Sequence, residues 1–219
     1  MKLKYLGHSA FEISILDYKI LIDPFLIKCP DYDYSKTTDI FVTHGHGDHL
    51  GDSIKISKET NATITGVFEL ANYCAEFGAK TRDISLGGWI NYPWGRVIAV
   101  FATHSSSFEH RYLGAPVGYI FDIDGIKIYH SGDTGLNYEM KLIGELYAPD
   151  YSLLPIGGNY TMDIEHCAIA SKFLKTKNVI PMHYNTFDVI EVDVSDFEKS
   201  IKGIGLNPIV LDINQEIEI

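Results

Sequence analysis

The sequence has few cysteines and no long apolar run. Its 3 cysteines, Cys29, Cys74 and Cys167, form no CxxC pair, so neither a disulfide framework nor a thiolate metal site is expected. A catalytic pair of Cys167 with His166 is not expected either, because adjacent helix positions do not face each other. No apolar run approaches the roughly 20 residues that a membrane span needs. Residues 1–5 read as a strand without a signal-peptide core, so we expect a cytoplasmic protein.

Positive charge is also scarce. There are 18 Lys and Arg against 29 Asp and Glu, and the net charge is −11. The only arginines are Arg82, Arg96 and Arg111. A nucleic-acid-binding surface needs clustered Lys and Arg, so we expect a small-molecule substrate and no nucleic-acid partner. A length of 219 residues is typical of one domain, which we expect to span residues 1–219.

Hydrophobic periodicity predicts alternating strands and helices. Strands are predicted near 2–6, 10–16, 19–23, 39–43, 89–91, 96–103, 117–123, 126–130, 151–155 and 178–182, and helices near 51–58, 67–77, 137–146, 163–175 and 194–202. Residues 11–43 are predicted to form a β-hairpin, then an acidic residue, Asp23, and then a further strand. The same order recurs in 117–155, where the acidic residue is Asp133. Two β-rich halves, each backed by helices, predict an α/β fold, a four-layer αββα sandwich.

The segment His44-Gly45-His46-Gly47-Asp48-His49 places four metal-ligand side chains within six residues. It follows an apolar run at 40–42 that reads as a short buried strand, and its glycines allow a tight turn there. Imidazole and carboxylate are ligands of zinc, iron or manganese. The alternative is a histidine-rich solvated loop. Thr43, just before the motif, is interpreted as structural.

Three further candidate ligands, His104, Asp133 and His183, each come at or just after the end of a predicted strand. α/β enzymes place functional groups at one edge of a sheet in this way. Each residue alone would be read as a loop or core residue, but together with the motif they predict one metal site. The serines at 105–107 could bind substrate, contact the metal loop or form a plain loop.

The HxHxDH motif, followed by single His, Asp and His at strand ends, resembles the metallo-β-lactamase superfamily. The segments 5–11 (YLGHSAF) and 20–25 (ILIDPF) resemble its branch of small metal-dependent hydrolases related to ascorbate-6-phosphate lactonases. The resemblance runs from residue 1 to about 185. It implies the metallo-β-lactamase fold and two divalent metal ions, zinc by preference, with manganese or iron as alternatives. Iron-redox relatives carry Glu where this chain has His46, so hydrolysis is favoured.

The resemblance also implies the roles of the ligands. His44, His46 and His104 would bind the first ion, Asp48, His49 and His183 the second, and Asp133 would bridge both. A hydroxide held by two ions is a nucleophile at neutral pH, and Asp48 would also act as catalytic proton acceptor. We expect a hydrolase of a small ester, lactone or phosphoester that self-associates as relatives do. The alternatives are a phosphodiesterase or nuclease at the same metals, or a non-catalytic metal-binding protein.

Five residues are candidates for supporting the ligands or binding substrate. Asp23 could accept the free N–H of a ligating histidine or form a turn before the next proline. His8 could border the pocket or cap a loop, and Arg111 could bind a phosphate or carboxylate or face solvent. By resemblance, His166 would face the pocket. The Tyr184 hydroxyl could assist a developing oxyanion, or the ring could serve packing.

Overall fold

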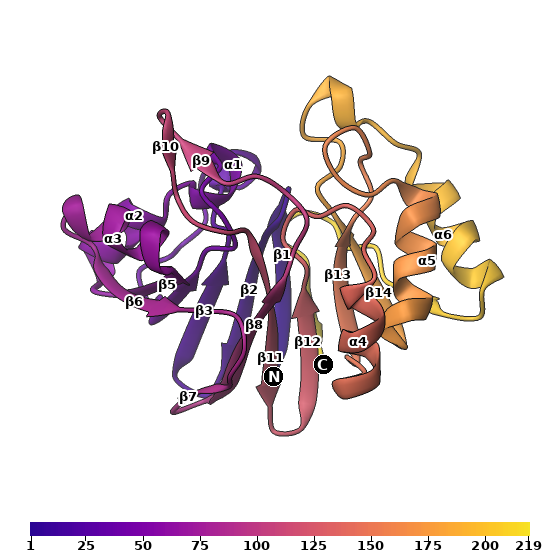
Figure 1. Cartoon of the computed structure of the whole chain (residues 1–219), viewed down its shortest axis with the longest axis horizontal. Helices are drawn as coiled ribbons and strands as arrows, with labels where there is room; N and C mark the ends of the chain where they lie inside the picture. The colour runs from indigo at the N-terminus through magenta and orange to yellow at the C-terminus, as the bar shows by residue number, and fades with distance from the viewer. The chain divides into compact units, whose positions relative to one another are not determined.

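The computed structural model describes all 219 residues and divides into two compact units. Unit 1 comprises Met1–Ser85, Ser105–Pro116 and Leu211–Ile219, and unit 2 comprises Leu86–His104 and Val117–Val210. Each unit contains one seven-stranded sheet (Figure 1). No helix is both long enough and apolar enough to cross a membrane.

The sheet of unit 1 has the order β16-β1-β2-β3-β4-β5-β6. Its strands are β1 (Lys2–Gly7), β2 (Ala10–Ile15), β3 (Tyr18–Ile22), β4 (Asp39–Phe41), β5 (Thr63–Val67), β6 (Lys80–Ile84) and β16 (Glu216–Glu218). A separate hairpin pairs β9 (Ser107–Phe108) with β10 (Arg111–Tyr112). The helices are η1 (Leu26–Lys28), α1 (Gly47–Leu50), α2 (Ser53–Thr60) and α3 (Phe68–Glu76).

Unit 1 changes from antiparallel to parallel pairing at β3. β2 and β3 form a hairpin whose apolar positions, including Phe11, Ile13 and Ile20, are fully buried. From β3 to β6 the strands pair in parallel. Parallel neighbours need a crossover connection, and α2 and α3 supply those between β4, β5 and β6. The C-terminal ends of β3, β4 and β5 therefore lie along one edge of this sheet.

The sheet of unit 2 has the order β15-β14-β13-β12-β11-β8-β7. Its strands are β7 (Ile90–Tyr92), β8 (Gly95–Phe101), β11 (Val117–Ile123), β12 (Ile126–His130), β13 (Tyr151–Pro155), β14 (Asn178–Met182) and β15 (Asn207–Pro208). The helices are α4 (Glu139–Leu146), α5 (Ile164–Leu174), η2 (Asp188–Ile190) and α6 (Val194–Gly203).

The core of unit 2 lies between its sheet and these helices. One buried cluster joins Ile120 and Leu154 of the sheet to Met140 of α4, Cys167 of α5 and Phe197 of α6. The Asp163 side chain caps the N-terminus of α5 by accepting the N–H of His166. Hydrophobic burial thus fixes the three helices on the sheet.

The two sheets have the same strand pattern, which confirms the internal duplication predicted from the sequence. In unit 1 the run β16-β1-β2-β3 is antiparallel and β3-β4-β5-β6 is parallel. In unit 2 the run β7-β8-β11-β12 is antiparallel and β12-β13-β14-β15 is parallel. β1 therefore corresponds to β8, β3 to β12, and β4 to β13.

Strands β5 and β6 have no counterpart among the strands predicted from the sequence. β6 reads KTRDI and is mostly exposed at the edge of its sheet, so it lacks the apolar run that marks a buried strand. β5 reads TITGV, and a glycine within a strand weakens the strand signal. The remaining predicted helices and strands formed within a few residues of their expected ends.

Helices α4 and α5 pack so closely that Gly144 is required between them. A Cβ on Gly144 would lie 2.0 Å from the Phe173 carbonyl oxygen. We expect Gly144→Ala to lower the free energy of unfolding by about 1–3 kcal/mol, because overpacking outweighs the better helix propensity of alanine. Gly203→Ala in α6 is the control, since a Cβ there meets nothing within 4 Å. Chemical denaturation should find Gly203→Ala neutral or more stable; equal losses in both variants would contradict this account.

All three cysteines are buried and free. Burial raises the pKa of the Cys74 and Cys167 thiols from the usual 9.0 to about 12. Both thiols should therefore resist Ellman's reagent at pH 8 until the protein is unfolded. Because only the folded state holds these protons above pH 9.0, the free energy of unfolding should fall as pH rises from 9.0 toward 12. Rapid labelling of either thiol in the native protein would contradict this.

Candidate metal centre

The ligands of unit 1 lie on the loop between β4 and α1. His46 is the residue before this single helical turn, and Asp48 and His49 lie within it. A Cβ on Gly45 would lie 2.6 Å from Leu113, and the Gly45 N–H donates to Ser106 Oγ over 3.0 Å. The segment 105–116 therefore packs directly on the ligand loop, which explains why this position is a glycine.

Asp23, just after β3, is a fully buried carboxylate that holds two parts of this loop. Its Oδ1 accepts the Thr43 N–H over 2.8 Å, and its Oδ2 accepts the Thr43 hydroxyl and His49 Nδ1, both over 2.7 Å. An ionised carboxylate only accepts hydrogen bonds, so the His49 proton lies on Nδ1. Nε2 of His49 is then the nitrogen that can bind a metal ion.

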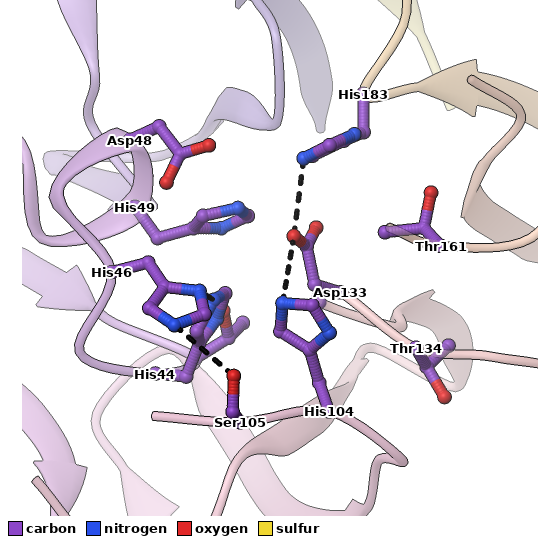
Figure 2. A network of polar contacts seen from close by, with 12 residues as sticks. His44, His46, Asp48, His49, His104, Ser105, Asp133, Thr134, Thr161 and His183 are labelled. Carbon is purple, nitrogen blue, oxygen red and sulfur yellow. Dashed lines mark hydrogen bonds and ion pairs between the residues drawn. The ribbon is translucent and has the colours of Figure 1, made fainter. Parts of the chain in front are cut away.

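Thr43 extends the same network to His44. Because its hydroxyl donates to Asp23, it accepts from Nδ1 of His44, 3.0 Å away. His44 then presents Nε2, which lies 2.9 Å from Nδ1 of His46. The other nitrogen of His46, Nε2, lies 3.3 Å from the Ser105 hydroxyl (Figure 2). Two imidazole nitrogens at this spacing fit neighbouring positions around one ion with metal–nitrogen bonds of about 2.0–2.1 Å.

Asp48 is held by a residue far away in the sequence. Its Oδ2 lies 3.1 Å from Nε2 of His8. The His8 side chain is 0% exposed, whereas that of Asp48 is 28% exposed. The His8 ring also makes edge contacts with Phe25 and His49, at centroid distances of 5.8 and 5.7 Å. His8 is therefore buried against two side chains of the ligand loop, Asp48 and His49.

Unit 2 contributes three candidate ligands, each after a strand of its sheet. His104 follows β8, Asp133 follows β12 and His183 follows β14. Oδ2 of Asp133 lies 3.4 Å from Nε2 of His104 and 3.1 Å from Nε2 of His183 (Figure 2). The Thr134 hydroxyl accepts the Thr103 N–H over 3.0 Å, which ties the loop of Asp133 to that of His104. One carboxylate oxygen between two imidazole nitrogens is suited to bridging two ions.

The donor set in both units fits divalent metal ions. All seven predicted ligands, and His8, belong to groups of His and Asp side chains that could hold an ion. His44 and His49 are fully buried, and Asp133 and His183 are each 2% exposed. Burying carboxylates among imidazoles is costly unless a cation or hydrogen bonds compensate. The nitrogen and oxygen donors without thiolate suit zinc, manganese or iron.

Three other predicted site residues contact groups outside the proposed ligand set. Both terminal guanidinium nitrogens of Arg111 pair with Glu76, at 2.7 and 2.8 Å. His166 is exposed on α5 and lies 3.6 Å from Asp163. Tyr184 is partly buried against the core of unit 2.

Sequence reasoning missed the roles of Thr43 and Thr134. Each lies directly beside a ligand in the chain, and each hydroxyl joins two loops. The adjacency was visible in the sequence, but the hydrogen-bond partners come from strands far apart in the chain. Only the folded sheets bring those strand ends together.

Comparisons with known proteins agree with this fold. The model of a protein family described as "Beta-lactamase superfamily domain" matches residues 2–183 of this chain. The chain is 45% identical to a UPF0173 metal-dependent hydrolase of Staphylothermus marinus, over 95% of this chain and 94% of the relative. Igni18 of Ignicoccus hospitalis, a metallo hydrolase, is 38% identical with a TM-score of 0.92, covering 99% and 97% of the two chains. The metallo-β-lactamase fold protein YhfI of Bacillus subtilis shares the fold alone, with 12% identity and a TM-score of 0.78 over 99% and 98%.

The chain therefore belongs to the β-lactamase superfamily and has the metallo-β-lactamase fold. Within that superfamily it is similar over nearly its whole length to the UPF0173 metal-dependent hydrolases.

The Thr43 hydroxyl should matter for metal binding because it orients His44. We expect Thr43→Val, which keeps the shape but removes the hydroxyl, to weaken binding of one metal ion by about 10–100-fold. Thr43→Ser keeps the hydroxyl and should bind nearly as the wild type does. Competition titration with a chromophoric chelator measures both. Equal affinity in Thr43→Val and wild type would show that the hydroxyl does not support the site.

Proposed function

We propose that this chain hydrolyses a small ester, lactone or phosphoester by means of a hydroxide held at two metal ions. The observation that carries the proposal is Asp133, whose Oδ2 lies between the Nε2 atoms of His104 and His183. A single oxygen in this position can serve two ions at once. The similarity to metal-dependent hydrolases over nearly the whole chain supports the same reaction class.

The proposed ligand assignment follows the family motif. His44, His46 and His104 bind the first ion, Asp48, His49 and His183 bind the second, and Asp133 bridges them. The hydrogen bonds within unit 1 agree with this division, since they turn Nε2 of His44 and Nδ1 of His46 toward each other.

Two bound ions would lower the pKa of a coordinated water to about 7 and polarise the oxygen of the scissile group. The protein residues have separate tasks. Asp23 and Thr43 fix the protonation of His49 and His44, and the Ser105 hydroxyl lies within hydrogen-bond distance of Nε2 of His46. Asp48, partly exposed, accepts a proton and orients the nucleophile.

Charge favours a small substrate over a nucleic acid. The net charge is −11. Arg111, on strand β10 of the short hairpin, already pairs with Glu76 through two guanidinium nitrogens. Binding a polyanion needs several cations free to contact phosphates. A small ester or lactone requires no such surface, so phosphodiesterase or nuclease activity is the less favoured alternative.

Metal content and turnover test the proposal together. Protein reconstituted with zinc or manganese should bind about two ions per chain, measured by plasma mass spectrometry, and should hydrolyse at least one of a panel of p-nitrophenyl esters, lactones and phosphoesters. A chelator should abolish this turnover. A fully loaded protein that hydrolyses nothing in the panel would contradict the proposal and favour a non-catalytic metal-binding protein.

Replacing Asp133 tests directly whether its carboxylate bridges two ions. Asp133→Ala should reduce bound metal and lower turnover by more than about 100-fold, the upper end for losing a group that only supports a ligand. Asp196→Ala, which removes an exposed carboxylate on α6, is the matched control. Two tightly bound ions and normal turnover in Asp133→Ala would show that Asp133 is not the bridge.

A further inference from the structure

We propose that His8 is a positioning residue for Asp48. Its Nε2–H holds Oδ2 of Asp48, so that the carboxylate presents its other oxygen to the metal ion in one fixed orientation. This inference rests on the proposed function and adds to it a residue outside the seven ligands.

The contact between His8 and Asp48 is direct and shielded. Nε2 of His8 lies 3.1 Å from Oδ2 of Asp48, and the His8 side chain is 0% exposed. Because an ionised carboxylate only accepts, His8 is the donor. A charge-assisted hydrogen bond from a buried, packed ring restricts the carboxylate more than one from a mobile surface group.

The backbone conformation and the neighbours of His8 hold its imidazole ring in one direction. Gly7 and His8 both have positive φ, +102° and +56°, where the β1–β2 register shifts. The left-handed region is unfavourable for a non-glycine residue and recurs at functional sites. The Tyr5 hydroxyl donates to the His8 carbonyl over 3.2 Å, and the Phe25 ring contacts the imidazole edge-on. Strain, a backbone hydrogen bond and an aromatic contact therefore fix the side chain's direction.

The duplicated topology gives an independent reason to assign His8 a role at the site. β1 and β8 occupy equivalent places in the two sheets. His8 follows β1 as His104 follows β8, and Asp23 follows β3 as Asp133 follows β12. In unit 2 both equivalent residues are proposed ligands. In unit 1 both contact ligand-loop side chains, Asp23 at His49 and His8 at Asp48.

His8 supports a ligand and is not itself a ligand. The second ion already has four proposed protein ligands, and the hydroxide adds another. A catalytic ion must keep a position open for substrate, and a further imidazole would fill it. As a donor to Asp48, His8 instead completes a pattern in unit 1, in which each motif side chain has a hydrogen-bond partner. The pairs are Thr43 with His44, Ser105 with His46, His8 with Asp48 and Asp23 with His49.

Two substitutions separate a donor from a ligand. His8→Gln keeps an N–H near the position of Nε2, whereas His8→Ala removes it. Both retain the backbone carbonyl that Tyr5 contacts. His110→Ala is the control, because His110 is exposed and also has a positive φ, +65°, so it carries the same backbone cost. The full-length protein is loaded with Co²⁺, whose visible absorption reports coordination without a substrate.

We expect His8→Ala to bind two Co²⁺ ions with the second about 10–100-fold weaker and an altered visible spectrum. His8→Gln and His110→Ala should match the wild type. On the ester panel, His8→Ala should lower kcat more than it raises KM, since the orientation of Asp48 acts on the chemical step.

Two results would overturn this role. His8→Ala with the wild-type Co²⁺ affinity and visible spectrum would show that the contact between His8 and Asp48 does not affect metal binding. Loss of one ion in both His8→Ala and His8→Gln would make His8 a ligand. A wild-type protein that binds fewer than two ions would instead contradict the proposed function, whatever the His8 variants do.

Discussion

The buried carboxylate of Asp23 is the interaction on which the ligand loop of unit 1 depends. It accepts three hydrogen bonds, two from Thr43 and one from His49, and none of these residues is exposed. A buried charge without such partners would be strongly unfavourable. Because Thr43 passes the contact on to His44, one carboxylate sets the tautomers of two histidines that are proposed to bind different ions.

The duplicated sheet explains how residues far apart in sequence become neighbours within each unit. In both sheets, antiparallel strands give way to parallel ones, so the C-terminal ends of successive strands share an edge. Asp23 and the ligand loop follow adjacent strands β3 and β4. In unit 2, Asp133 follows β12 and His183 follows β14, which is separated from β12 by β13 alone. Strand order, not sequence distance, brings these side chains together.

Much of the fold could be predicted from the sequence, because the long apolar runs of β8 and β11 and the amphipathic helices α4 and α6 carry strong periodic signals. β5 and β6 could not be predicted, since β5 is interrupted by a glycine and β6 is a mostly exposed edge strand without an apolar pattern. The motif also predicted which residues could ligate metal. The sequence also indicated His8 as a candidate for supporting the ligands. It could not predict that His8 contacts Asp48 or that Thr43 contacts His44, because each hydrogen bond depends on a backbone direction set by the fold.

The central claim is that seven side chains bind two ions that share Asp133. A crystal structure of the zinc-loaded protein, with anomalous scattering collected at the zinc absorption edge, tests it most directly. The account predicts two anomalous peaks, one bound by Nε2 of His44 and Nδ1 of His46, and both bound by the Asp133 carboxylate. A single peak, or two peaks of which Asp133 contacts only one, would contradict it.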